Sequence, residues 1–242
     1  MHAIARLGVL LAGLILASCS PPEDSTPDYR YRLTVEVETP EGLRTGSSVI
    51  EVRQSMGRSA GSGFGKKIMR RARGEAVAVD LPGGRTLYAL LRSDDNVDWA
   101  TNVMQMLAPE IEGEPWEDVF DNVLLIEGEV EVPRTWPPIA PFGERSAYPM
   151  LVTFGDESDP TSVARVDPDD LASTFGEDYE LGGVTVELTD DPVTTGIEKR
   201  LGWLDSYRTR WLDGTSTISE DLTTDDLTAH LSAGSFSTEF AK

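Results

Sequence analysis

Residues 29–39 read Tyr-Arg-Tyr-Arg-Leu-Thr-Val-Glu-Val-Glu-Thr, so that apolar and polar side chains alternate along the stretch. Successive side chains of a β-strand point to opposite faces, and this alternation predicts a strand with one buried face. The turn residues Pro40-Glu41-Gly42 follow, and residues 48–53 predict a returning strand. The fold is therefore expected to begin with antiparallel pairing of neighbouring strands.

The next part of the chain predicts a second hairpin. Residues 75–81 and 85–91 are strand-like and flank Pro82-Gly83-Gly84, a turn sequence. The intervening residues 55–74 are rich in Gly, Ser and Arg, which predicts a mobile loop. The first ninety residues are thus expected to form four antiparallel strands.

Helical spacing becomes more frequent towards the C-terminus. Helices are predicted for residues 95–107 with Asp94 as N-cap, for a short segment from 167 to Gly176, for 195–212 and for 224–231, and strands for 123–132, 148–154 and 184–188. The proline-rich residues 133–147 are expected to form a loop or a sheet edge. The fold class predicted is α+β, an antiparallel β-rich domain with a sandwich as one arrangement, with short helices mainly in the C-terminal half.

The N-terminus has the three parts of a secretory signal. Arg6 supplies positive charge, an uncharged apolar stretch runs from Leu7 to Leu16, and the small residues Ala17 and Ser18 precede Cys19. The apolar stretch is about half of the roughly 20 residues that span a bilayer, which argues against a lasting transmembrane helix. An ordinary signal peptide with a chance cysteine is the alternative.

The segment Leu16-Ala17-Ser18-Cys19 resembles the lipobox of bacterial lipoproteins. The resemblance implies cleavage before Cys19, diacylglycerol on its thiol, and a membrane anchor facing the periplasm; Ser20 favours the outer membrane. It divides the chain into a signal peptide (1–18), a lipidated tether (19–28) and one domain (29–242), with a sub-boundary near 133–147. Cys19 is the only cysteine, so the domain would have no disulfide.

The chain is strongly acidic. Its formal charge is −21, and removal of residues 1–18 takes away Arg6 and no acid, which leaves −22. This excess argues against nucleic-acid binding and against docking of the bare domain surface on anionic lipid. Solubility is one explanation of the charge, and encounter with a cationic protein of the envelope is the other.

The charges are segregated along the chain. Residues 93–133 contain twelve acids and no Lys or Arg, whereas residues 53–73 contain no acid and seven basic residues: Arg53, Arg58, Lys66, Lys67, Arg70, Arg71 and Arg73. A basic loop folded over acidic neighbours would explain this pattern. The alternative is a binding site for an anionic partner such as a lipid headgroup or a cell-wall polymer.

Motifs for chemistry are few. His230 is the single histidine after the signal segment, so neither a catalytic triad nor a zinc site is expected. Asp94-Asp95-Asn96-Val97-Asp98 begins like a calcium loop, but Trp99 stands where glycine is needed. The run from Gly61 to Lys67 lacks the glycine and the hydroxyl residue of a phosphate-binding loop. No metal, nucleotide or cofactor is therefore predicted.

Trp116 and Trp136 lie in loop-like, proline-rich surroundings where exposed indoles could stack on sugars. Apolar plugs beneath loops are the other interpretation. A carboxylate-dependent glycan hydrolase would need two acids at a defined separation beside one of these indoles. The leading prediction is instead a non-enzymatic, lipid-anchored envelope protein with a binding or structural role.

Four proline- and acid-containing segments carry a second resemblance: residues 133–138 (Pro-Arg-Thr-Trp-Pro-Pro), 145–150 (Arg-Ser-Ala-Tyr-Pro-Met), 166–171 (Val-Asp-Pro-Asp-Asp-Leu) and 189–198 (Thr-Asp-Asp-Pro-Val-Thr-Thr-Gly-Ile-Glu). Together they resemble an uncharacterised family of proteobacterial envelope proteins. The resemblance implies one evolving domain and supplies no activity, ligand or site residue.

Overall fold

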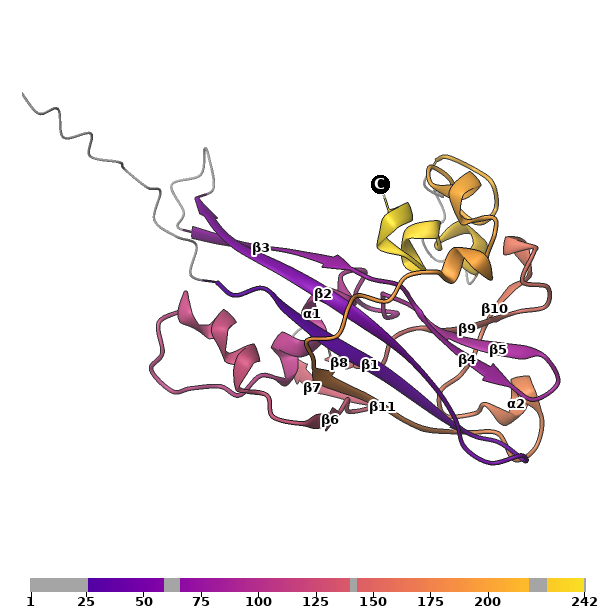
Figure 1. The fold of residues 1–242 in the computed structure, drawn as a ribbon, viewed down its shortest axis with the longest axis horizontal. Coiled ribbons are helices and arrows are strands. Elements are labelled where there is room, and N and C mark those ends of the chain that lie inside the picture. Colours follow the sequence, from indigo (N-terminus) through magenta and orange to yellow (C-terminus); the bar gives the residue numbers. More distant parts are fainter. Residues whose placement is uncertain (1–25, 59–65, 140–142, 218–225, 242) are drawn as a thin grey trace, which may run out of the picture.

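A computed structural model describes residues 26–58, 66–139, 143–217 and 226–241. These residues form eleven antiparallel strands in three sheets, with short helices and turns between them (Figure 1). This confirms the predicted α+β, β-rich fold class. No helix within the described ranges is long and apolar enough to cross a membrane.

The largest sheet has five strands in the order β3-β2-β1-β11-β6. Its bounds are β1 (Tyr29–Glu38), β2 (Arg44–Arg58), β3 (Lys66–Arg73), β6 (Glu129–Glu131) and β11 (Glu180–Leu188). The alternating stretch at 29–38 is the central strand β1, with Tyr31, Leu33 and Val35 fully buried on one face. The sequence pattern that predicts the strand therefore also defines the core side of the sheet.

The second sheet has four strands in the order β10-β9-β5-β4. Its bounds are β4 (Val77–Leu81), β5 (Arg85–Ala89), β9 (Leu151–Phe154) and β10 (Val163–Arg165). The β4–β5 hairpin around Pro82-Gly83-Gly84 confirms that prediction. The proline-rich segment forms a separate two-stranded ribbon, β7 (Thr135–Ile139) with β8 (Gly143–Ser146), in which both strands are edges.

The main core fills the space between the two large sheets, as in a sandwich. Leu33, Val35 and Ile50 of the first sheet belong to the same buried cluster as Val79 and Leu87 of the second. Helix α1 (Trp99–Leu107) contributes to this cluster through buried apolar residues, namely Trp99, Ala100, Val103 and Met104. The buried apolar surface of the two sheets is thus shared, which is the main source of their stabilisation.

A second core lies on the other face of the four-stranded sheet. Tyr88, Val152 and Phe154 of that face pack with Trp203 and Phe236 from the C-terminal part of the chain. Figure 1 shows the C-terminal turns covering this sheet. The two central strands of this sheet, β5 and β9, are buried on both faces, which explains why β5 shows no polar alternation.

The C-terminal helices predicted for 195–212 and 224–231 are wrong in type and length. The chain there forms single 3₁₀ turns, η3 (Ile197–Lys199), η4 (Leu204–Tyr207), η5 (Leu227–Ala229), η6 (Ala233–Ser235) and η7 (Thr238–Phe240). The apolar residues Ile197, Leu201 and Leu204 are nonetheless buried. Helical spacing thus identified buried residues, while packing on the sheet interrupts the helix.

Three other boundaries differ from prediction. Residues 55–58 and 66–73 are strands and not a loop, so the first ninety residues contain five strands. The first long helix begins at Trp99, because residues 93–98 form a turn in which the N–H of Ser93 bonds to the carbonyl of Asn96. The segment predicted as strand 123–132 contains the end of η1 (Asp118–Leu125) and the short β6.

The remaining short elements agree better with the sequence. The helix ended by Gly176 is α2 (Ala172–Phe175), and η2 (Pro160–Ser162) precedes β10. Segments on both sides of residues 133–147 contribute to one sheet, since β11 pairs with β1 and β6 pairs with β11. The five-stranded sheet therefore contains strands from both sides of the predicted sub-boundary.

Candidate functional site

The seven basic residues between 53 and 73 lie on the β2–β3 hairpin, and its residues 51–58 and 66–73 are called the basic hairpin below. The register pairs Arg53 with Arg71 and Glu51 with Arg73. The side chains of Arg53, Lys67, Arg71 and Arg73 are exposed, on the sheet face opposite the core. Pairing of two strands therefore gathers four of the predicted residues on one solvent-facing surface, the outer basic face.

The outer basic face is only partly neutralised. The Glu51 carboxylate lies 3.0 Å from Arg53 Nε and 4.0 Å from Arg30 Nε. Among the described residues, Lys67, Arg71 and Arg73 make no ion pair. The face thus keeps a positive charge in a chain whose overall charge is −21.

The inner face of β3 carries two of the remaining cations. Lys66 Nζ lies 3.6 Å from Glu117 Oε1, which is the contact between basic and acidic segments that one interpretation of the sequence expected. The Arg70 guanidinium lies 5.8 Å from the ring centre of Phe120. Arg58 ends β2, and its side chain lies outside the described part of the structure, as does the whole of Cys19.

One cavity lies beside β3, and a second cavity adjoins it. The larger, of about 700 Å³, is lined by Arg70, Arg71 and the start of α1. The smaller, of about 330 Å³, is lined by Arg92 and Trp211, and both share the lining residues Leu91, Val97, Gly234 and Ala241. We call the two together the β3 groove.

Sequence reasoning missed Arg92 and Trp211. Arg92 directly precedes the acidic run that begins at Ser93, and nothing in the sequence connects it with Arg70. Trp211 was assigned to a helix, whereas it forms an isolated bridge with Ser232. Tertiary packing alone brings these residues to the groove.

The basic hairpin extends past the beginning of β1. Tyr29 pairs with Val52, so the hairpin beyond that pair projects from the end of the sheet where the described chain starts. Asp28 Oδ1 accepts a hydrogen bond of 2.8 Å from the N–H of Gln54. The first described residues are thereby fixed against the hairpin.

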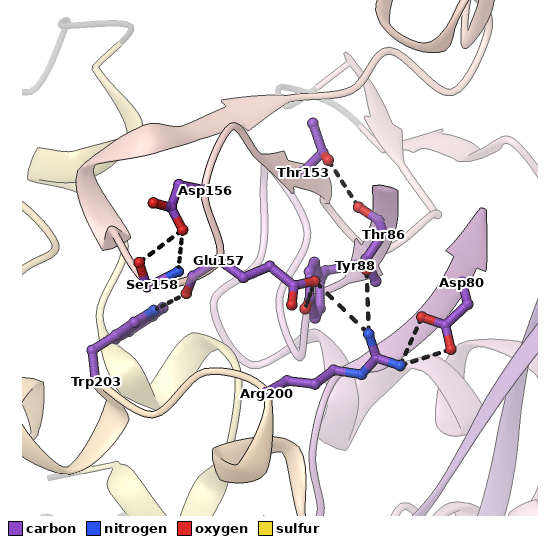
Figure 2. A network of polar contacts seen from close by, with 9 residues as sticks. All are labelled: Asp80, Thr86, Tyr88, Thr153, Asp156, Glu157, Ser158, Arg200 and Trp203. Carbon is purple, nitrogen blue, oxygen red and sulfur yellow. Dashed lines mark hydrogen bonds and ion pairs between the residues drawn. The ribbon is translucent and has the colours of Figure 1, made fainter. Parts of the chain in front are cut away.

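A separate polar network joins the second sheet to the C-terminal turns (Figure 2). Tyr88 Oη donates a 2.6 Å hydrogen bond to Glu157 Oε1, and Arg200 Nη2 donates one of 2.7 Å to Asp80 Oδ2. Trp203 Nε1 donates to the backbone oxygen of Glu157 at 3.0 Å. Burial and the bond to Glu157 raise the pKa of Tyr88, so the phenol stays protonated and acts as a donor. Because its groups are paired with one another, this network fits a role in packing.

Glu75 is the other buried acid near these turns. Its Oε2 accepts a 3.0 Å hydrogen bond from the N–H of Ile197 at the start of η3. Burial raises the pKa of this carboxyl, partly offset by the backbone hydrogen bond. A cavity of about 280 Å³ lies beside it, lined also by Lys199 and Arg200. The geometry places Glu75 as the cap of a turn.

The two tryptophans differ in their surroundings. Trp136 is only 7% exposed and belongs to the main core, so it is an apolar plug and not a surface for sugars. Trp116 is 48% exposed and packs edge-on against Phe120, with 5.2 Å between ring centres. Neither indole lines any of four cavities of about 280 to 700 Å³ in the described structure.

The acidic motif at 94–98 makes contacts within the protein. Asp94 pairs with Arg165, and Asp95 Oδ2 accepts a 2.9 Å hydrogen bond from the N–H of Ser146. Asp191 similarly pairs with Arg32. Within the described ranges, no three His, Cys, Asp or Glu residues are grouped to hold a metal ion. These acids therefore serve turns and ion pairs in the structure.

Comparisons with known proteins identify no relative. No protein-family model matches the chain. Searches of curated proteins and of solved structures likewise gave no match. The outer basic face and the β3 groove are accordingly interpreted from their own geometry.

Proposed function

We propose that this chain is a lipid-anchored protein of a bacterial cell envelope that binds an anionic partner through the basic hairpin. The observation that carries the proposal is the outer basic face, on which Arg53, Lys67, Arg71 and Arg73 are exposed together. The binding role is non-enzymatic, and the lipid on Cys19 would hold the domain at the membrane.

The arrangement of these cations is unfavourable for the isolated fold. Arg53 and Arg71 lie directly opposite each other on neighbouring strands. Like charges in that position destabilise a sheet by roughly 0.2–1 kcal/mol. Acidic residues are twice as numerous as basic ones, yet Glu51 is the only acid of the basic hairpin. A surface that costs stability and remains unneutralised is typical of a binding site.

Protection of a sheet edge is the competing explanation. Basic side chains on edge strands prevent edge-to-edge aggregation, and β3 is an edge strand. Arg53 lies on β2 just beyond the last pair of β1 with β2, Tyr29 with Val52, so this part of the hairpin is paired with β3 alone. Both explanations account for the exposed charge, and the binding experiments below distinguish them.

The position of the hairpin fits an anchored protein. The described chain begins beside Gln54, and the hairpin projects at that same end. A tether that starts at Cys19 would enter the domain there. The basic hairpin would then be close to the membrane and to polymers that lie against it. There its positive charge would offset the electrostatic repulsion between the acidic domain and an anionic surface.

Binding is tested with three anionic probes: purified peptidoglycan sacculi, vesicles containing phosphatidylglycerol, and poly-L-glutamate. The protein carries Cys19→Ala, which keeps it free of lipid. We expect co-sedimentation or retention with at least one probe at low salt. A second variant carries Arg53→Gln, Lys67→Gln, Arg71→Gln and Arg73→Gln. It should bind at least about tenfold more weakly, which is a loss of about 1.4 kcal/mol in binding free energy.

A matched control removes the same charge elsewhere. Lys199→Gln, Arg165→Gln, Arg208→Gln and Arg210→Gln neutralise four exposed cations outside the hairpin. This variant should bind nearly as well as the parent protein. Failure of all three probes to bind, or equal losses in the two variants, would contradict a binding role for the basic hairpin.

A further inference from the structure

The free edge of β3 forms one wall of the β3 groove. β3 is an outer strand of its sheet, paired only with β2. In an edge strand every second residue directs its N–H and C=O groups away from the neighbouring strand. Among the described residues, no backbone hydrogen bond outside the sheet uses a group of residues 66–73. Unsatisfied backbone donors and acceptors therefore face the groove.

The groove is positively charged within an acidic chain. Arg70, Arg71 and Arg92 line it, against a single carboxylate, Asp98. None of the three arginines forms an ion pair with a described residue. With acids twice as common as bases in the sequence, three unpaired arginines in one groove are an unusual local excess.

Two of these arginines are also half-buried. Nη1 of Arg70 is shielded from solvent and has no hydrogen-bond partner among the described atoms. Nη1 of Arg92 donates to the carbonyl of His230 at 3.1 Å. Burial lowers the pKa of both guanidinium groups, although arginine remains charged at neutral pH. A buried donor without a partner is costly, and the positive charge of both groups favours an anionic group in the groove.

The remaining walls are partly apolar, with Thr101 and Thr238 as polar members in the larger cavity and Ser232 and Ser235 in the smaller one. Ala72, Leu91, Val97 and Ala100 line the larger cavity, and Trp211 lies in the smaller one. Apolar walls beside an edge strand match an extended polypeptide, whose alternate side chains need pockets while its backbone pairs with the edge. A flat phospholipid surface or a rigid glycan offers no backbone to pair with β3.

We propose that the β3 groove binds an extended acidic segment of a partner polypeptide, which adds as a further strand beside β3 and places carboxylates on Arg70, Arg71 and Arg92. The inference rests on the proposed anionic partner and specifies its class. The peptide backbone supplies the donors and acceptors that β3 leaves unpaired, and the arginines select acidic side chains. The outer basic face would add longer-range attraction.

The test uses a fluorescein-labelled peptide that repeats Glu-Glu-Val-Val, which directs glutamates to both faces of the added strand, because Arg70 and Arg71 lie on opposite faces of β3. Binding is measured by fluorescence anisotropy against the full chain carrying Cys19→Ala. We expect saturable binding. A peptide of the same sequence with alternate backbone nitrogens methylated on one edge should bind at least about tenfold more weakly, because it loses strand pairing. Replacing glutamate by glutamine in the peptide should cause a comparable loss.

Protein variants locate the site. Arg70→Gln and Arg92→Gln should each weaken the peptide about tenfold, whereas Arg210→Gln, an exposed cation outside the groove, should not. Arg70 and Arg92 are half-buried, so thermal unfolding of each variant is measured alongside. Arg71→Gln changes an exposed side chain of the same groove and provides a variant whose folding is not at risk.

Each outcome decides the proposal. Absence of peptide binding, equal affinity for the methylated peptide, or no effect of Arg71→Gln would overturn it. Binding of sacculi or vesicles that depends on Arg53, Lys67 and Arg73, without peptide binding, would overturn the groove proposal and leave the proposed function standing. Failure of every probe and of the peptide would remove both.

Discussion

At the scale of single residues, Tyr88 links the second sheet to the loop after β9. Its hydroxyl donates to Glu157, which is about one-third exposed. Tyr88→Phe keeps the ring, with its edge-on contacts to Phe154 and Phe236, and removes only the hydroxyl. We expect a loss of about 1 kcal/mol in the free energy of unfolding, measured by urea denaturation.

Tyr207→Phe is the matched control for Tyr88→Phe. Tyr207 also packs against an aromatic ring, that of Trp203, but its hydroxyl makes no hydrogen bond to a described residue. Its replacement should change the free energy of unfolding by less than about 0.5 kcal/mol. Equal effects of the two substitutions would mean that the network in Figure 2 does not stabilise the fold.

Glu75 gives a pH-dependent prediction. Burial raises the pKa of its carboxyl, so the folded protein binds this proton more tightly than the unfolded chain does. The contribution of this group to stability therefore falls as pH rises above the ordinary glutamate value of about 4. Glu75→Gln keeps an oxygen acceptor for the N–H of Ile197 and removes the charge.

Relative to the parent protein, Glu75→Gln should gain stability as the pH is raised above about 4, over the range in which the carboxyl of the folded protein loses its proton. Urea denaturation at several pH values measures this difference, and Glu38→Gln, an exposed residue, corrects for the change in net charge. A difference that is constant with pH, or that reverses in sign, would show that the Glu75 carboxyl is not perturbed in this direction.

Single-residue properties were predictable only where the local pattern determines burial. The alternation of residues 29–38 correctly assigns Tyr31, Leu33 and Val35 to the core. Trp116 and Trp136 have similar local sequence surroundings, yet one is exposed and the other buried. Their difference depends on contacts with distant segments, which the sequence pattern does not contain.

At the scale of elements, Gly46 marks a close approach of the two large sheets. A Cβ atom at this position would lie 2.4 Å from the carbonyl oxygen of Ala78 on β4. Because backbone has to move to relieve that overlap, Gly46→Ala should reduce the free energy of unfolding by at least about 2 kcal/mol. Thermal or urea unfolding checks this value.

Gly183→Ala serves as the control for Gly46→Ala. Gly183 lies on β11 of the same sheet, and a Cβ atom there would meet nothing within 4 Å. Its replacement should change stability by no more than about 0.5 kcal/mol. If Gly46→Ala were equally mild, the two sheets would not pack as closely at this point as the structure places them.

The basic hairpin shows why some elements were mispredicted. Residues 55–74 contain Gly, Ser and many cations, a composition that disfavours a strand when judged locally. Residues 55–58 and 66–73 are strands because β3 pairs with β2 over eight residue pairs and β2 pairs with β1. The cations can be identified from the sequence. Their position on one face follows only from the register in which β2 pairs with β3.

The C-terminal turns show the opposite case. Helical spacing from Thr195 to Leu212 marked Ile197, Leu201 and Leu204, which are indeed buried. The chain nevertheless turns after Lys199 and again after Tyr207, since hydrogen bonds to Glu75 and to the loop at Glu157 fix these turns on the sheet. Tertiary contacts here override helical propensity.

At the scale of the whole molecule, the five-stranded sheet carries opposite charges at its two edges. Its β3 edge carries Lys67, Arg71 and Arg73, while its β6 edge carries Glu129 and Glu131. Within the acidic segment at 93–133, Glu129 and Glu131 thus lie at the edge opposite β3, whereas Asp98 lines the β3 groove and Glu117 contacts Lys66.

The membrane anchor is a prediction about the whole chain. Expressed in a Gram-negative bacterium, the protein should fractionate with membranes, and its intact mass should correspond to a chain that starts at a lipid-modified Cys19. Cys19→Ala should lose both the lipid mass and the membrane fraction. A native chain that is soluble and unlipidated would contradict the anchor.

The central claim is that the basic hairpin is the binding surface. The most direct measurement maps backbone amide chemical shifts of the isotope-labelled Cys19→Ala protein during titration with the anionic probe that binds. The account predicts that the largest shifts fall on residues 51–58 and 66–73 and on the groove beside them, and that they diminish as salt is added. Shifts concentrated on the four-stranded sheet or around the network of Figure 2 would contradict it.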